Sequence, residues 1–332
     1  MVARVLSAGE QTALAHLPPN VRLADRLLRE KGLPSRRNEQ WKWSDLRAAF
    51  DENVQFAVVP DIDEARTDAA AARGDFIAML AAAFGQTETV KVAAGETIVS
   101  IDRIEAGQFT PRALEIELAP GAAMTRIVIQ PAQAGLALDS VRVHVGAGGA
   151  YRQFILAEGA KLARIETHVD VAGEGVEIAL GGVYLAGAAR HVDLTSVINH
   201  RIGGGTTRQL IKGAARKGGR GVFQGRIEVA RGAQKTDARQ YHHGLLLEEG
   251  AEIYAKPELE IYADDVQCAH GNTAGALDEA ALFYMRARGI PEAAARAMLT
   301  EAFLLEAVPD YLPEDVRAEV TSRIKAWLGG AP

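Results

Sequence analysis

Short apolar-rich runs separated by glycine-rich turns fill the middle of the chain, and this pattern constrains the fold most. Several runs alternate apolar and polar residues with a period of two, which is typical of half-buried β-strands. The runs lie at residues 97–101, 113–118, 125–129, 141–145, 153–156, 164–171, 176–180, 191–195, 221–229 and 245–247. No helical segment long enough for repeated βαβ crossovers separates them. The pattern predicts an all-β unit, either a sandwich or barrel or a β-solenoid with coils of roughly 20 to 25 residues.

Two glycine-containing segments within this zone are interpreted as a turn and a loop. Residues 203–205 and the two threonines after them lack the Gly-Lys-Ser/Thr ending of a phosphate-binding loop, so we interpret them as a turn. The run from Lys212 to Arg220 holds four basic residues among glycines. We expect it to be a solvated loop.

The segment before the β-rich zone has the spacing of helices. Ser7 followed by Glu10 predicts a capping box, and Asn20 predicts the cap of a second helical segment. The apolar spacing of residues 65–84 predicts a third helix. Between the second and the third, Trp41 and Trp43 stand two residues apart. Two large aromatic side chains are costly to expose, so we expect them to fix this segment onto the core.

The segment after the β-rich zone returns to helical spacing. Asp278 predicts the N-cap of its first helix. The last helix carries an apolar stripe at four-residue spacing: Val316, Val320, Ile324 and Leu328. Such a stripe needs a cover, and the sequence leaves two choices, the β-rich unit or another protein.

Charge and cysteine content limit the class of function. The formal net charge is -6, which disfavours nonspecific binding to nucleic acid, because phosphate attracts basic surfaces. The chain has a single cysteine, which fits a reducing compartment. The N-terminus lacks the apolar core of a signal peptide, and no stretch approaches the ~18 apolar residues of a membrane helix. We therefore expect a cytoplasmic protein that binds neither nucleic acid nor membrane.

The densest group of candidate ligands contains Cys268 and His270. Residues two apart on a strand face the same side, so both side chains can reach one metal ion. The alternative is that both are inert core residues. One thiol cannot provide the roughly four ligands, mostly thiolates, of an iron–sulfur cluster. A cluster role would therefore require ligands from another chain, and a structural zinc finger is excluded by the same count.

Other chemistry-bearing residues give weaker hypotheses. Asp264 and Asp265 are adjacent, so on a strand they point to opposite faces and make a poor acid/base pair. Glu258 or Glu260 can supply a second carboxylate, which keeps open a β-solenoid enzyme acting on carbohydrate, with a groove of aromatics and carboxylates. His242 and His243 likewise point apart and are poor joint ligands.

The long string KPELEIYADDVQCAHGNTAGALDEAALFYMRARG, residues 256–289, resembles the SufB/SufD family of iron–sulfur assembly scaffolds. The helical region after it, the β-rich runs from Phe223 to Leu247 and the segment RNEQWKWSDL at residues 37–46 are similar to the same family. The short chain and its lone cysteine resemble the SufD type rather than the SufB type. The doublet His242–His243 departs from the family pattern.

This resemblance implies a mainly β fold, with a right-handed parallel β-helix at residues 88–276. A helical region at 1–87 would precede it, and one at 277–332 would dock a SufC-type ATPase. The chain would be a scaffold subunit and not an enzyme. It would bind no cofactor alone and share a transient iron–sulfur cluster at an interface with a SufB-type scaffold, or form a homodimer when isolated.

The resemblance also implies site roles. His270 matches the family histidine implicated in cluster assembly at the interface, and Cys268 matches a nearby family cysteine. Both are candidate interface ligands for iron or the cluster. We expect the β-helix edges near the C-terminal end of the core to pair with the partner. We also expect ATPase motion to expose a buried Cys268–His270 segment. A purely structural subunit is the remaining alternative.

Overall fold

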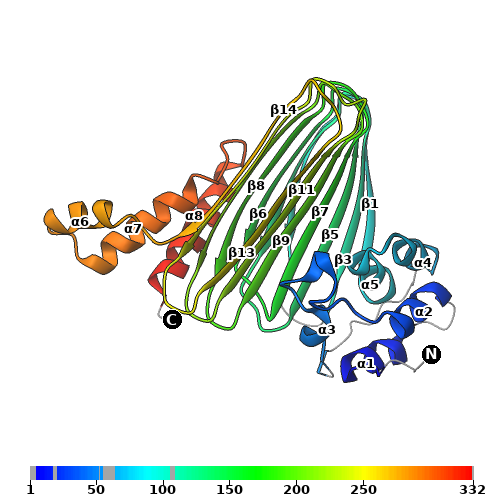
Figure 1. Cartoon of the computed structure of the whole chain (residues 1–332), viewed down its shortest axis with the longest axis horizontal. Coiled ribbons are helices and arrows are strands. Elements are labelled where there is room, and N and C mark those ends of the chain that lie inside the picture. The colour runs from blue at the N-terminus through cyan, green and yellow to red at the C-terminus, as the bar shows by residue number, and fades with distance from the viewer. Residues whose placement is uncertain (1–4, 18–20, 52, 55–63, 105–108, 331–332) are drawn as a thin grey trace.

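The computed structural model describes residues 5–17, 21–51, 53–54, 64–104 and 109–330. Its centre is a parallel β-solenoid in which odd-numbered strands form one sheet and even-numbered strands the other (Figure 1). The first sheet holds β1 (Gln86–Val92), β3 (Arg112–Leu118), β5 (Leu136–Val145), β7 (Leu162–Val171), β9 (His191–His200), β11 (Arg220–Val229) and β13 (Glu252–Ile261). The second holds β2 (Thr97–Arg103), β4 (Ala123–Gln130), β6 (Ala150–Ala157), β8 (Glu177–Ala186), β10 (Thr206–Ala215), β12 (Asp237–Leu246) and β14 (Gln267–Gly275). The mainly β prediction is confirmed, and the solenoid is the correct choice of the two architectures.

Each coil places one strand in each sheet, directly above the equivalent strand of the previous coil. Met124 pairs with Tyr151, a step of 27 residues, whereas Gln209 pairs with Gln240, a step of 31. The coils are therefore longer than the 20 to 25 residues expected. Because the step also varies, the chain can form stacked coils without a strict sequence repeat.

Stacked tight turns hold one corner of the solenoid in register. Gly148 and Gly204 have φ of 65° and 70°, a region that L-residues with side chains rarely enter. The Gly148 amide donates to the Glu174 carbonyl of the next coil at 2.7 Å, and the Gly204 amide to that of Gln234 at 2.9 Å. The glycine-rich turns thus bond one coil to the next.

The strand β10 corrects the prediction of a solvated loop. Lys212 lies within β10 and is only 5% exposed. Its ammonium pairs with Glu306 and lies 4.2 Å from the centre of the Phe303 ring. A strand that contains a lysine and a glycine forms here because a C-terminal helix covers its outer face.

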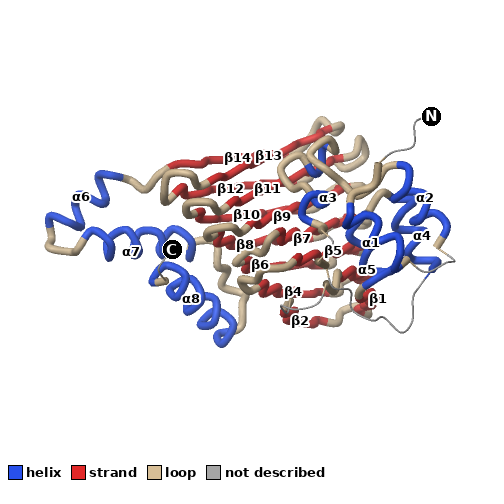
Figure 2. Tube along the Cα trace, turned by 90° about the horizontal axis from the view of Figure 1, so that it is seen from below, coloured by secondary structure: helices blue, strands red, loops and turns tan. Residues whose placement is uncertain are grey.

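The N-terminal helices pack along one side of the solenoid (Figure 2). They are α1 (Ala8–His16), α2 (Arg22–Glu30), α3 (Leu46–Ala49), α4 (Glu64–Arg73) and α5 (Phe76–Phe84), with a 3-10 turn at Glu39–Trp41. The capping box of Ser7 and Glu10 is confirmed. The predicted cap Asn20 lies outside the described residues. The prediction of one helix over residues 65–84 is wrong, because Gly74 has φ of 71° and Asp75 then caps a second helix.

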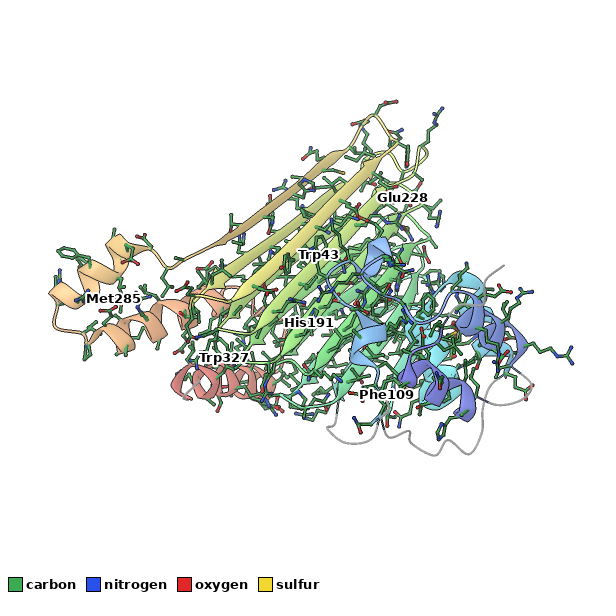
Figure 3. The ribbon with its side chains drawn as sticks, turned by 60° about the horizontal axis from the view of Figure 1, so that its bottom comes forward. Trp43, Phe109, His191, Glu228, Met285 and Trp327 are labelled. Atoms are coloured by element: carbon green, nitrogen blue, oxygen red, sulfur yellow. The ribbon has the colours of Figure 1, made fainter. Side chains whose placement is uncertain are left out.

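The C-terminal helices are α6 (Glu279–Ala287), α7 (Glu292–Leu305) and α8 (Glu314–Gly329). Asp278 caps α6 as predicted. The apolar stripe of α8 packs with Phe154, Leu156 and Val183 on the outer face of the even-numbered sheet. The solenoid therefore covers the last helix. In contrast, α6 and the start of α7 project away from both sheets, with Met285 near the tip (Figure 3).

None of the helices in the described ranges is long and apolar enough to cross a membrane. The division into regions 1–87, 88–276 and 277–332 stays a prediction.

Candidate functional site

The two predicted ligands lie on the last strand of the solenoid. In β14, Cys268 pairs in register with Ala238 and His270 with Gln240. Ala238 and Gln240 are completely buried and face the interior. The same register places Cys268 and His270 on the inward-facing side of the final coil.

The end of the solenoid at this point is open. Because β13 and β14 are the last strands of their sheets, no described coil covers the inward side of β14 (Figure 2). His270 is exposed and Cys268 is half-buried. In the chain alone this segment is therefore not fully buried, and its burial in a complex with partner chains stays a prediction.

The thiol of Cys268 is held partly in the apolar core. It packs against the interior cluster that contains Ile227, Val229 and Ala238. Burial raises the pKa of the Cys268 thiol above its ordinary value, which keeps the thiol protonated at neutral pH. The thiol can thus act as a ligand only after it loses a proton to a bound metal or a base.

A buried histidine anchors the ligand-bearing strand. The His242 imidazole lies between the rings of Phe223 and Tyr184, with centroids at 5.0 Å and 5.8 Å. Its Nδ1 lies 2.6 Å from Asn272 Oδ1 on β14, and its Nε2 lies 3.0 Å from the Tyr184 hydroxyl. Both contacts are satisfied when Nδ1–H donates to the amide oxygen and the tyrosine donates to Nε2. His242 therefore bonds β14 to the interior.

This arrangement also confirms the prediction that His242 and His243 point apart. His242 is buried inside, whereas His243 faces outward and contacts Thr273 at 2.8 Å. Burial lowers the pKa of His242 to about 4, so its ring is neutral at physiological pH.

The open end offers unpaired backbone groups. Gln267 donates its amide at 2.9 Å to the carbonyl of Thr236, the residue just before β12. Because peptide groups alternate sides along a strand, Cys268, His270 and Asn272 direct theirs away from β12. A parallel strand edge of this kind is a template for pairing with another chain.

The tryptophan motif forms a strap, residues 39–44, across the outer face of the odd-numbered sheet. The guanidinium carbon of Arg164 on β7 lies 3.8 Å from the centre of the Trp41 ring. Ser44 donates to Asp193 on β9, and its Oγ lies 3.0 Å from Nε2 of His191. Trp41 and Ser44 are both buried, so the expected fixing of this segment onto the core is confirmed for Trp41.

The strap continues to the edge strand. Trp43 stacks on Tyr254 of β13 with centroids 5.8 Å apart, and Glu39 binds the Lys256 ammonium at 2.8 Å. The strap therefore contacts strands from β7 to β13. Sequence reasoning predicted that the tryptophans are fixed but missed Arg164, the partner of Trp41, and Asp193, the partner of Ser44, which are distant in the chain.

The carboxylates proposed for a carbohydrate enzyme do not form a catalytic pair. Asp264 and Asp265 lie in the turn between β13 and β14, and Asp265 is paired with Lys235. Glu258 and Glu260 line a hollow of about 240 Å³ beside the strap. The residues lining this hollow include no phenylalanine, tyrosine or tryptophan. Both glutamates face cations: Glu258 faces Lys256 at 3.1 Å, and Glu260 faces Arg226 at 3.5 Å.

The described residues contain no group of three or more histidine, cysteine, aspartate or glutamate side chains placed to hold a metal ion. Cys268 and His270 thus offer two donors on one face. An iron–sulfur cluster at this place would take its remaining ligands from outside the described part of the chain.

Comparison with known proteins gives a family match over the solenoid. Residues 81–303 match the family model described as SUF system FeS cluster assembly, SufBD core domain. The chain is 36% identical to the iron–sulfur cluster assembly protein SufD of Escherichia coli over 181 residues, which are 54% of this chain and 43% of that protein. It is 35% identical to the chloroplastic protein ABCI7 of Arabidopsis thaliana over 179 residues, 54% of this chain and 38% of that protein.

Another relative matches more of the chain at a lower sequence identity. A SufBD family protein of Mycobacterium tuberculosis is 26% identical over 257 residues, which are 75% of this chain and 64% of that protein. The chain thus spans about two fifths of the length of the two more similar relatives named above.

Proposed function

The chain belongs to the SufBD core family of the SUF system for iron–sulfur cluster assembly, and on that premise we propose that it acts as a SufD-type scaffold subunit. It pairs with a SufB-type chain and lends ligands to a nascent cluster at their contact. The cluster is cargo that forms there and leaves. This chain serves in assembly and does not catalyse a reaction alone.

The observation that carries the proposal is the position of the ligand pair at an uncapped end. Cys268 and His270 face the interior side of the last coil, where the described chain provides nothing to cover them. A partner that added a strand to β14 would bury both side chains at the new contact. It would also supply the thiolates that this chain lacks.

The projecting C-terminal helices support the docking of a SufC-type ATPase. Phe283 is 74% exposed, Tyr284 58% and Met298 52%. These side chains lie on α6 and α7, which extend away from the solenoid (Figure 1). Large exposed apolar side chains on neighbouring helices are typical of protein interfaces. Motion of a docked ATPase would be transmitted to the solenoid through α7 and α8.

His270 binds iron through a neutral imidazole nitrogen, so acid competes with iron for this site. The half-buried Cys268 thiol loses its proton on binding. Without a SufB-type partner the same edge pairs two copies of this chain as a homodimer. We assign the complex to the cytoplasm.

The test is affinity capture of the tagged chain from its native cell, with mass spectrometry, followed by cluster maturation in the captured complex. We expect a SufB-type chain and an ATPase to be captured with both the wild-type protein and His270→Ala. We expect the His270→Ala complex to contain little iron and sulfide. If it matures clusters normally, the ligand assignment is wrong and a purely structural subunit is favoured.

A further inference from the structure

A ladder of polar side chains runs along the inside of the solenoid and ends beside His270. Arg126, Gln153, Gln209 and Gln240 occupy the same register on β4, β6, β10 and β12, and His270 follows on β14. The apolar Leu180 holds this register on β8, between Gln153 and Gln209. Each of the four polar members contacts a polar partner in the interior. Gln153 donates to Thr167 at 2.7 Å, for example, and Gln209 donates to Ser196 at 2.9 Å.

Gln240 is the member of the ladder next to His270. Its Nε2 donates to Gln209 Oε1 at 2.9 Å, but its Oε1 is buried and has no hydrogen-bond partner. Arg126 on β4 also has one buried atom without a partner, Nη1. The Gln240 side chain is completely buried and lies under Gly225, where an added Cβ would collide with Nε2. A buried amide oxygen without a donor costs about 1–3 kcal/mol. Such a group can accept a hydrogen bond from a donor that comes within reach.

His270 is placed by the strand register to provide this donor. It is the register partner of Gln240 on the adjacent strand, and neighbouring strands lie about 4.8 Å apart. A histidine that binds a metal through one nitrogen almost always donates its other N–H to an oxygen, which fixes its tautomer and orientation. Gln240 is placed to be that acceptor.

We propose that Gln240 is a positioning residue that accepts the free N–H of His270 when His270 binds iron. This inference rests on the proposed function of His270. Gln209 and Ser196 hold the Gln240 amide in turn, so the interior ladder orients the imidazole from behind. Partner and iron then approach from the open side.

The experiment measures Fe(II) affinity in the complex reconstituted with its SufB-type and SufC-type partners. Gln240→Met removes the acceptor at similar length and should weaken binding 10- to 100-fold. Gln240→Glu keeps an oxygen acceptor and should retain most of the affinity. Gln153→Met is the matched control, a buried ladder glutamine four coils from His270, and should leave the affinity unchanged.

A double-mutant cycle separates positioning from a general structural effect. In the His270→Ala background, Gln240→Met should cause no further loss, because the ring that it orients is absent. An equal additional loss there, or unchanged affinity for Gln240→Met alone, would overturn the inference. If His270→Ala itself leaves Fe(II) affinity unchanged, the proposed function fails and the inference fails with it.

Discussion

Arg164 stacks beneath Trp41, with its guanidinium carbon 3.8 Å from the centre of the indole ring, and both side chains are buried. The same guanidinium binds Glu166 at 2.6 Å and Asp193 at 2.7 Å. The buried guanidinium thus has two carboxylate partners, and Asp193 also accepts a hydrogen bond from Ser44 of the strap. This contact joins the N-terminal strap to the solenoid.

Replacement of Trp41 tests how much the contact between the strap and the solenoid contributes to the free energy of unfolding. Trp41→Ala removes a buried indole and should lower the free energy of unfolding by about 3–5 kcal/mol. Trp43→Ala is the matched control and should cost less, because Trp43 is only half-buried. Urea titration followed by circular dichroism measures both. Equal losses for the two variants would show that the Arg164 contact contributes little.

Acid should destabilise the protein through its buried histidines. Burial lowers the pKa of His242 and His200 to about 4, below the ordinary value of 6.5. The unfolded chain therefore takes up these protons first as the pH falls. Their contribution to stability is complete above pH 6.5 and is lost between pH 6.5 and about 4.

His242→Phe tests how much one of these histidines contributes to the pH dependence of stability. The ring stack with Tyr184 and Phe223 is retained, while the titrating group is removed. The slope of unfolding free energy against pH between 6.5 and 4 should decrease by up to about 1.4 kcal/mol per pH unit. Urea titrations at several pH values give this slope. An unchanged slope would mean that His242 does not titrate as a buried neutral ring.

The exposed aromatic residues of α6 should be needed for ATPase docking and not for folding. Phe283→Ala and Tyr284→Ala should each weaken binding of the SufC-type ATPase at least tenfold, because exposed aromatic residues often dominate interface energy. Stability should change by less than about 0.5 kcal/mol. Val99→Ala, at a similarly exposed apolar residue on β2, is the control for binding. Unchanged affinity for both aromatic variants would remove this surface from the docking proposal.

Proline at the edge of β14 should block pairing with a partner scaffold. Peptide groups point alternately to the two edges of a strand. The Gln267 N–H points toward β12, so the N–H of Ala274, seven residues later, points away from β12. Ala274→Pro removes a donor that only a partner strand can use, and edge strands tolerate such a proline. Size-exclusion chromatography of the mixed chains should show loss of the complex while the isolated variant stays folded. Normal complex formation would exclude pairing through this edge.

The sequence predicted most of the solenoid but missed four of its strands. The missed strands are β1, β10, β13 and β14. In β10, Gly213 is required because the Tyr184 ring fills the space of a side chain there. In β13, Pro257 and alternating charges hide the pattern. These segments are strands because of contacts with other coils, which a local pattern cannot contain.

The candidate site was also predictable only in part, because some of its contacts join residues of different coils. The two-residue spacing of Cys268 and His270 predicts a shared face, and the structure places both on the inward side of β14. The roles of Gln240 and Asn272 depend on a register between coils about 30 residues apart. The departure at His242 was visible in the sequence. Its ring stack and its bond to β14 were not.

The central claim is that this chain lends a histidine ligand across a subunit contact. The direct measurement is pulsed EPR of the reduced cluster in a complex where only this chain carries ¹⁵N-labelled histidine. The account predicts a ¹⁵N coupling of a directly bound nitrogen that disappears in His270→Ala. A cluster that forms in the labelled complex without any such coupling would contradict it.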